Sequence, residues 1–197
     1  MGRKLSTAVI GAGLAMVSVL STSGTAQAHG YTTAPTSRQS FCAQGQVSNC
    51  GAIQWEPQSV EGPKGFPEAG PPDGRICSGG NQRFAELDDP RGGSWPATGV
   101  TAGQGYTFRW TFTVPHRTSE FEYYITRNGY NPSQPITRAA LESQPFMTVP
   151  MGGRQPATTE NHQGSMPTGK SGRHVIVAVW NVADTGNAFY SCSDVRF

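Results

Sequence analysis

This sequence has few charged side chains and no block of like charge. Charged residues make up 14% of its 197 residues, and the formal net charge is +2. Long charged helices are therefore not expected, and neither nucleic acid nor an anionic membrane is indicated as a partner. The length suits one ordinary domain, and because nothing in the sequence indicates oligomerisation, we expect a monomer.

The motifs of common hydrolases and nucleotide-binding proteins are missing. The sequence contains no G-x-S-x-G, no H-E-x-x-H and no G-x-x-x-x-G-K-[ST], which removes the usual signatures of serine hydrolases, zinc proteases and P-loop proteins. An acid and base pair could be drawn from four carboxylates, but no spacing singles out two of them. The four are Glu56, Glu61, Asp88 and Asp89. A glycosidase is therefore unsupported.

Glycine and proline are abundant, with 25 and 15 residues, which favours a turn-rich β architecture. Residues 31–101 show little periodicity and are interrupted by prolines, so we expect loops with a helical turn or two. From Gln104 onward, alternating or continuous apolar runs predict strands at 106–114, 121–125, 146–149, 174–180 and 188–197. The fold class predicted is mainly β: an immunoglobulin or fibronectin-III-like β-sandwich with a long loop-rich, partly helical insertion near the N-terminus.

The first 28 residues read as a secretory signal peptide. Arg3 and Lys4 precede an apolar stretch of 16 residues, 5–20, and Ala26-Gln27-Ala28 is an A-x-A cleavage site. The stretch is short of the roughly 20 residues that a membrane span needs. We therefore expect a secreted protein whose domain, 29–197, begins at His29; a competing cut after Ala26 would instead expose Gln27.

Four cysteines in an exported chain predict two disulfides with three alternative connectivities. Cys42 and Cys50 enclose a short polar loop that closes at little cost. Cys77 and Cys192 would then close a long loop, worth roughly 3–5 kcal/mol on the chain-entropy model. A zinc site is not indicated, because no C-x-x-C is present.

Two of the four histidines stand out as candidate metal ligands. His162 and His174 read as surface or hydrogen-bonded residues, whereas His116 follows Pro115 at the end of the clearest predicted strand. If His29 becomes the first residue, its α-amine and imidazole, together with the His116 imidazole, offer three nitrogens, a set that suits copper. An α-amine with a pKa of about 7.7–8.0 must lose its proton to bind, so copper affinity should fall as the pH drops through that range.

Four segments together resemble the bacterial lytic polysaccharide monooxygenases of auxiliary-activity family ten, in particular its single-domain, chitin-active branch. They are His29-Gly30-Tyr31, Trp55-Glu56-Pro57-Gln58-Ser59-Val60-Glu61, Val114-Pro115-His116 and Asp184-Thr185-Gly186-Asn187-Ala188-Phe189-Tyr190. The resemblance spans nearly the whole chain after the signal peptide and keeps the order of the motifs. It implies oxidative cleavage of crystalline chitin at C1, with an external electron donor and O₂ or H₂O₂ as co-substrate.

The resemblance also implies a role for each motif residue. His29 and His116 would hold one copper ion per chain as a histidine brace, Phe189 would lie on its apolar axial side, and Glu61 would place or protonate the oxygen co-substrate. The positions expected on the flat substrate-binding surface are Trp55, Glu56, Asp184 and Asn187. A flat surface suits a crystalline polymer, and an exposed Trp55 offers an apolar face to pyranose rings.

Two positions depart from the family pattern. Trp55 replaces a common tyrosine, which changes little because both side chains stack on sugars. Val114 stands where a smaller alanine is usual and would narrow access to the copper.

Two other functions remain open. A non-catalytic chitin-binding module would use Trp55 but leaves a terminal histidine unexplained. A secreted copper carrier would use the same two histidines but would ignore polysaccharide.

Overall fold

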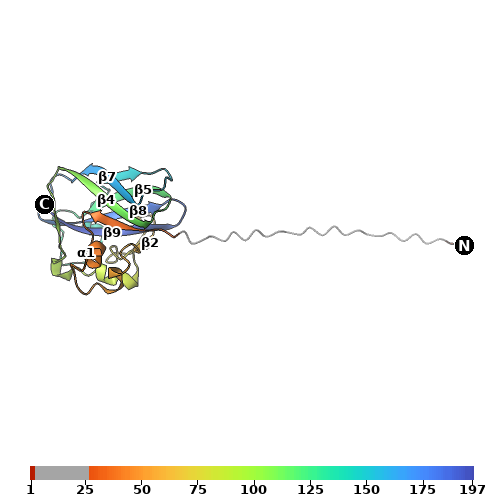
Figure 1. Ribbon diagram of the computed structural model, residues 1–197, viewed down its shortest axis with the longest axis horizontal. Helices are drawn as coiled ribbons and strands as arrows, with labels where there is room; N and C mark the ends of the chain where they lie inside the picture. Colours follow the sequence, from red (N-terminus) through yellow and green to blue (C-terminus); the bar gives the residue numbers. More distant parts are fainter. Residues whose placement is uncertain (3–26) are drawn as a thin grey trace.

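The computed structural model describes residues 1–2 and 27–197 (Figure 1). The predicted signal peptide, residues 1–28, therefore lies mostly outside the described residues and stays a prediction. In the described part of the chain, no helix has the length and apolar character needed to cross a membrane.

Two β-sheets face each other, as the sequence predicts. The smaller sheet has the order β1-β4-β7; its strands are β1 (His29–Ala34), β4 (Gly105–Val114) and β7 (Thr159–Ser165). The larger sheet has the order β2-β9-β8-β5-β6, with β3 paired to β9; its strands are β2 (Glu61–Pro63), β3 (Thr98–Gly99), β5 (Thr118–Ile125), β6 (Met147–Pro150), β8 (Arg173–Val182) and β9 (Asn187–Arg196).

The core between the sheets follows from alternation along β4. Phe108, Trp110 and Phe112 are buried, whereas Arg109 and Thr113 are exposed and Thr111 is half-buried, which is the period of two that a half-buried strand requires. The β4 side chains meet aromatic residues of the larger sheet: the rings of Phe112 and Trp180 lie 4.7 Å apart in an edge-to-face arrangement that aromatic quadrupoles favour.

The larger sheet is covered on its outer face as well, by the segment between β1 and β4. In Figure 1 this segment gathers on the side of the sheet opposite β4 and β7. Its apolar side chains form a second core with β8 and β9, contributed by Ile53, Phe66, Ile76, Phe84, Leu87 and Trp95. The continuous apolar run of β8 is therefore explained, since nine of its ten residues are buried.

The covering segment is mainly loop with short helical pieces, as predicted. These are α1 (Arg38–Ala43), η1 (Gly51–Gln54), η2 (Gln82–Leu87) and η3 (Arg91–Gly93), and a further 3-10 turn, η4 (Arg138–Ala140), follows β5. The α1 helix begins where the Ser37 hydroxyl accepts a hydrogen bond from the Ser40 amide, which satisfies one of the free donors at the helix start.

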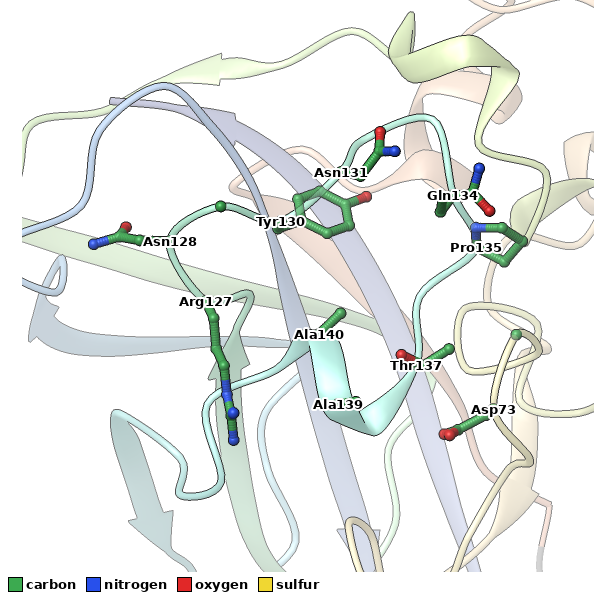
Figure 2. Close-up of a pocket in the computed structure, with 12 residues that line it drawn as sticks. Asp73, Arg127, Asn128, Tyr130, Asn131, Gln134, Pro135, Thr137, Ala139 and Ala140 are labelled. Carbon is green, nitrogen blue, oxygen red and sulfur yellow. The ribbon is translucent and has the colours of Figure 1, made fainter.

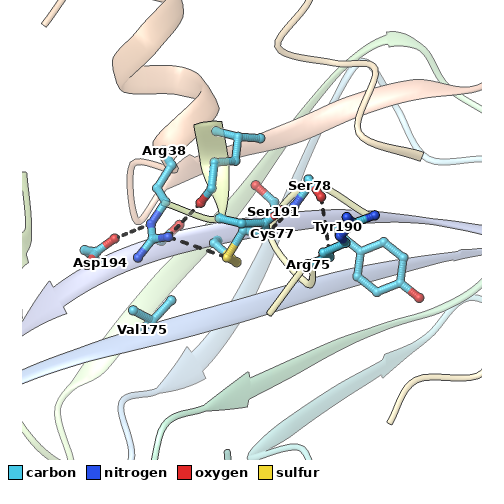
Figure 3. Close-up of a disulfide and its surroundings, with 12 residues drawn as sticks. Arg38, Arg75, Cys77, Ser78, Val175, Tyr190, Ser191 and Asp194 are labelled. Atoms are coloured by element: carbon cyan, nitrogen blue, oxygen red, sulfur yellow. Dashed lines mark hydrogen bonds and ion pairs between the residues drawn. A yellow bond between two sulfur atoms is a disulfide. The ribbon is translucent and has the colours of Figure 1, made fainter. Parts of the chain in front are cut away.

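Both disulfides form with the favoured pairing, Cys42–Cys50 and Cys77–Cys192. The first joins the end of α1 to the start of η1. The second fastens the covering segment to β9, and Figure 3 shows Arg38 of α1 beside it. Arg38 makes a buried 2.8 Å ion pair with Asp194 of β9, so a covalent and an ionic contact hold the covering segment on the sheet.

Four strands were not predicted: the very short β2 and β3, and two longer ones. The first of the longer two, β1, lies largely in the segment expected to be irregular, and its buried Thr32 is hydrogen-bonded at 2.7 Å to the hydroxyl of Ser191. The second, β7, is a polar run whose fully buried side chain is His162. Hydrophobic periodicity misses such strands because their inward positions are polar and are satisfied only by partners far away in the sequence.

His162 was expected at the surface or hydrogen-bonded, and the structure corrects the first alternative. It is 4% exposed and shares a 2.7 Å hydrogen bond with the Tyr123 hydroxyl, which accepts another from Trp110 Nε1. Burial lowers the pKa of His162 to about 4. The neutral ring therefore persists in the folded protein at a pH where an unfolded histidine, with a pKa of about 6.5, is already protonated.

We predict a stability loss in acid that depends on His162. As pH falls from about 6.5 to about 4, only the unfolded state gains this proton, so the free energy of unfolding should drop by about 3 kcal/mol. In His162→Gln this contribution disappears. Urea unfolding of both proteins at pH 7 and pH 4 measures the difference, and an equal acid loss in the two proteins would contradict the prediction.

Candidate metal centre

The β1–β4 ladder brings the two predicted metal ligands to one end of the smaller sheet. His29 is the first residue of β1 and lies opposite Val114, the last residue of β4. Pro115 has no amide N–H to continue the ladder, and His116 follows it directly. The sequence therefore places both imidazoles where the paired strands end. The half-buried Val114 lies two residues before His116.

Glycine at position 30 is required by the close approach of β1 to β4. A Cβ there would lie 2.4 Å from Cδ1 of Phe112 and 3.2 Å from the Thr111 carbonyl oxygen. On its other side, the Gly30 amide donates to the Gln58 carbonyl at 3.0 Å. His29 is thus held between the β4 backbone and the loop that follows Trp55.

The two imidazoles have unused or exchangeable nitrogen positions. Nδ1 of His29 is buried and has no hydrogen-bond partner, an arrangement that costs free energy unless the atom serves as a ligand. Nε2 of His116 lies 2.8 Å from Oδ1 of Asp184, and this hydrogen bond lowers the pKa of the exposed Asp184 carboxyl. The carboxylate thus holds the position that a metal ion on Nε2 would take.

These residues fit copper, provided that His29 is the first residue. Within residues 1–2 and 27–197, no three His, Cys, Asp or Glu side chains are grouped so as to hold a metal ion. The two imidazoles therefore need a third donor from elsewhere, and the α-amine of His29 is part of the same residue as the orphaned Nδ1. Three nitrogen donors of this kind are the chemistry that Cu(II) prefers.

Phe189 of the larger sheet lies next to His29, and Glu61 lies next to Phe189. The rings of Phe189 and His29 are 6.4 Å apart, and Phe189, 1% exposed, also packs on Trp180 at 4.8 Å. Glu61 of β2 pairs with Phe189 of β9 in the ladder, and its exposed carboxylate accepts a 2.7 Å hydrogen bond from the Asn187 amide. Phe189 is thus both a core residue and the apolar neighbour of the candidate metal site.

The remaining surface residues lie on the covering segment. Trp55 lies directly after η1 and has 81% of its surface exposed. Within residues 27–197 no other large apolar side chain is exposed. Glu56 beside it forms an ion pair with Arg83 of η2. The Cys42–Cys50 disulfide ends at the residue that precedes η1, so it fixes the base of the turn that presents Trp55.

No acid and base pair forms among the four carboxylates considered from the sequence. Glu56 is paired with Arg83 and Glu61 with Asn187. Asp88 accepts from the Ser78 amide at 3.0 Å, and burial raises its pKa. The contacts found in the described chain thus give a glycosidase no support.

A hollow of about 620 Å³ lies far from His29 and His116 and is not part of this site. Figure 2 shows it beside Tyr130 and Thr137, in the loop that follows β5. Since β5 starts two residues after His116 and runs for eight residues, the loop begins roughly 25 Å away.

Sequence reasoning missed two side chains next to the predicted ones. Arg83 pairs with Glu56, and Lys64 donates to two backbone carbonyls in the turn that carries Asp184. The chain has only three lysines, Lys4, Lys64 and Lys170, but this rarity does not indicate what Lys64 contacts.

Comparison with known proteins decides the family. A profile described as "Lytic polysaccharide mono-oxygenase, cellulose-degrading" matches residues 29–195. An AA10 lytic polysaccharide monooxygenase from Streptomyces lividans is 59% identical, with a TM-score of 0.84, and the match covers 86% of this chain and all of that chain. The chain belongs to the lytic polysaccharide monooxygenases.

Two further proteins to which the chain is similar bear on the site. The structure of a Bacillus amyloliquefaciens CBM33 in complex with Cu(I) is 41% identical with a TM-score of 0.79, over 85% of this chain and 99% of that chain. The GlcNAc-binding protein A of Shewanella oneidensis is 45% identical, over 89% of this chain and 37% of its own length. This monooxygenase chain thus spans about half or less of the length of the curated relatives that it matches.

We predict that Gly30→Ala destabilises this monooxygenase by about 1–3 kcal/mol, because the added methyl group overpacks against Phe112 and the β4 backbone. Gly99→Ala is the matched control, since a Cβ on that strand glycine meets nothing within 4 Å. Chemical unfolding measures both. Equal stability of the two variants would show that β1 is not pressed against β4.

Proposed function

We propose that this chain is a secreted, copper-dependent monooxygenase that cleaves crystalline chitin at C1, with one copper ion per chain. The observation that carries the proposal is the buried, unpartnered Nδ1 of His29 at the same strand end as His116. Family membership and a relative crystallised with Cu(I) support copper as the metal. The A-x-A site before His29 and the two disulfides support export.

Copper held by His29 and His116 would supply the redox chemistry for oxidising a strong C–H bond. The substrate C1–H becomes C1–OH with one oxygen atom, either from O₂ with two electrons and two protons or from H₂O₂, and water is released in both cases. The hydroxylated C1 then releases the neighbouring sugar as an alcohol, which leaves a lactone that water opens to an aldonic acid.

Glu61 would handle protons in this reaction. Its carboxylate is exposed and held by Asn187, close to the ring of Phe189 through the β2–β9 ladder, so it can hold and pass a proton at the site. Phe189 has no donor atom, and its buried ring keeps water and other ligands from its side of the site.

Chitin is the substrate that these observations favour. The exposed indole of Trp55 offers a face for pyranose C–H groups, and a neutral polymer suits the low charge of the chain. The name of the GlcNAc-binding relative favours chitin, whereas the family description mentions cellulose. Both polymers therefore belong in the test.

Protein that begins at His29, loaded with copper and given a reductant, should release oligosaccharides with aldonic-acid ends from β-chitin and few or none from cellulose. Mass spectrometry of the soluble products makes the measurement. Oxidised products from cellulose alone would overturn the choice of substrate, and none from either polymer would overturn the monooxygenase activity.

A non-catalytic chitin-binding module is the alternative, because the exposure of Trp55 suits binding alone. His116→Ala and Trp55→Ala separate the two functions. We expect His116→Ala to lose product formation and at least about 100-fold in copper affinity while still binding chitin. Trp55→Ala should lose about fivefold to tenfold in chitin binding and keep its copper affinity.

Sedimentation with β-chitin and isothermal titration with Cu(II) measure these two properties. Under the binding-module alternative, His116→Ala would behave as the wild type in every assay.

A further inference from the structure

The turn between β8 and β9, residues 183–186, connects the two halves of the site. Asp184 in this turn contacts Nε2 of His116 on the smaller-sheet side. Asn187, the first residue after it, contacts Glu61 of β2. The position of this turn therefore sets where a neighbour of the metal ligand and a neighbour of the proton-handling carboxylate lie.

Lys64 fastens this turn to β2. Its backbone amide donates to the Gly186 carbonyl at 2.9 Å, and its ammonium group donates to the carbonyls of Val182 and Thr185, the latter at 2.7 Å. Lys64, the residue directly after β2, thus donates hydrogen bonds to three carbonyls. Two of these carbonyls belong to the turn and one to the last residue of β8.

The other edge of the turn is held by the segment that carries His116. The Ala183 amide donates to the Arg117 carbonyl at 2.7 Å. With Lys64 on one side and Arg117 on the other, the turn has little freedom to shift relative to either half of the site.

The ammonium group of Lys64 has given up water for these contacts. Desolvation lowers its pKa, while the negative charges of Asp184 and Glu120 act in the opposite direction. Hydrogen bonds from a charged donor are stronger than neutral ones, so replacement by an apolar side chain leaves turn carbonyls without their donor.

We propose that Lys64 is a positioning residue, which holds the β8–β9 turn so that Asn187 meets Glu61 and, while no metal is bound to Nε2 of His116, Asp184 meets that nitrogen. Its effect on reaction rate rests on the proposed function, whereas its effect on the turn does not. The side chains of Asp184 and Asn187 are exposed, and the side chains they contact in the described residues are those of His116 and Glu61. Their orientation is therefore sensitive to the position of the turn.

Lys170 provides a matched control. It is also a partly buried lysine whose ammonium group donates to a backbone carbonyl, that of Thr126 at 2.9 Å, and it pairs with Glu142 at 2.6 Å. Thr126 directly follows β5 at the end remote from His116. Lys64→Met and Lys170→Met therefore remove similar contacts at opposite ends of the sandwich.

The first test uses the metal-free protein and NMR. In Lys64→Met, the side-chain amide signals of Asn187 and the ring signals of His116 should move from their wild-type positions, whereas Lys170→Met should leave both unchanged. Wild-type signals in folded Lys64→Met, or the same changes in Lys170→Met, would overturn the proposal. Lack of activity in every protein would overturn the proposed function without affecting this result.

The second test measures turnover on β-chitin. Lys64→Met should lower the rate of oxidised product release about tenfold or more, as expected for misplaced groups at a reaction site, and Lys170→Met should lower it less than twofold. Lys64→Arg, which restores a cation with N–H donors, should recover part of the loss and the wild-type Asn187 signals. If Lys64→Met does not fold, the NMR spectra of Lys64→Arg and Lys64→Gln test the proposal instead. Wild-type Asn187 and His116 signals in Lys64→Gln would overturn it.

Discussion

The close approach of β1 to β4 is the contact on which the site depends. His29 is fixed by a strand whose second residue has no room for a side chain, because the Phe112 ring and the Thr111 carbonyl occupy that space. The same ladder ends at Val114, so the position of His116 follows from it. A metal centre held by His29 and His116 would need no dedicated loop, because the sheet itself sets where these two residues lie.

The covering segment gives this end of the sandwich its working surface. Trp55, Glu61 and Lys64 all come from it, and it stays in place through a second core and the Cys77–Cys192 disulfide to β9. Short loops could not bury Phe66, Phe84 and Trp95 against the outer face of the larger sheet. The role of the covering segment as a layer on that sheet therefore explains both its length and its disulfides.

Much of the fold could be predicted from the sequence, because β4 and β8 carry strong patterns. The alternation around Trp110 and the continuous apolar run ending at Trp180 have one structural explanation each. The polar β7 strand carried no such pattern, since the burial of His162 depends on Tyr123, 39 residues away. Periodicity reports what a strand buries in a hydrophobic core, and it says little about inward polar residues that pair with distant partners.

The candidate site divides in the same way. His29 and His116 could be found because a predicted cleavage and a strand end single them out, and the family motifs added Glu61 and Phe189. Lys64 could not be found, because its partners are backbone carbonyls, which every sequence contains and which no side-chain pattern reveals.

Electron paramagnetic resonance of Cu(II) tests the central claim most directly, with two proteins that differ by one residue. A chain that begins at His29 should show a tetragonal centre with three nitrogen donors, whereas a chain that keeps Ala28 in front of His29 has no α-amine there and should show a different spectrum and weaker binding. Identical spectra and equal affinities for the two chains would contradict the account.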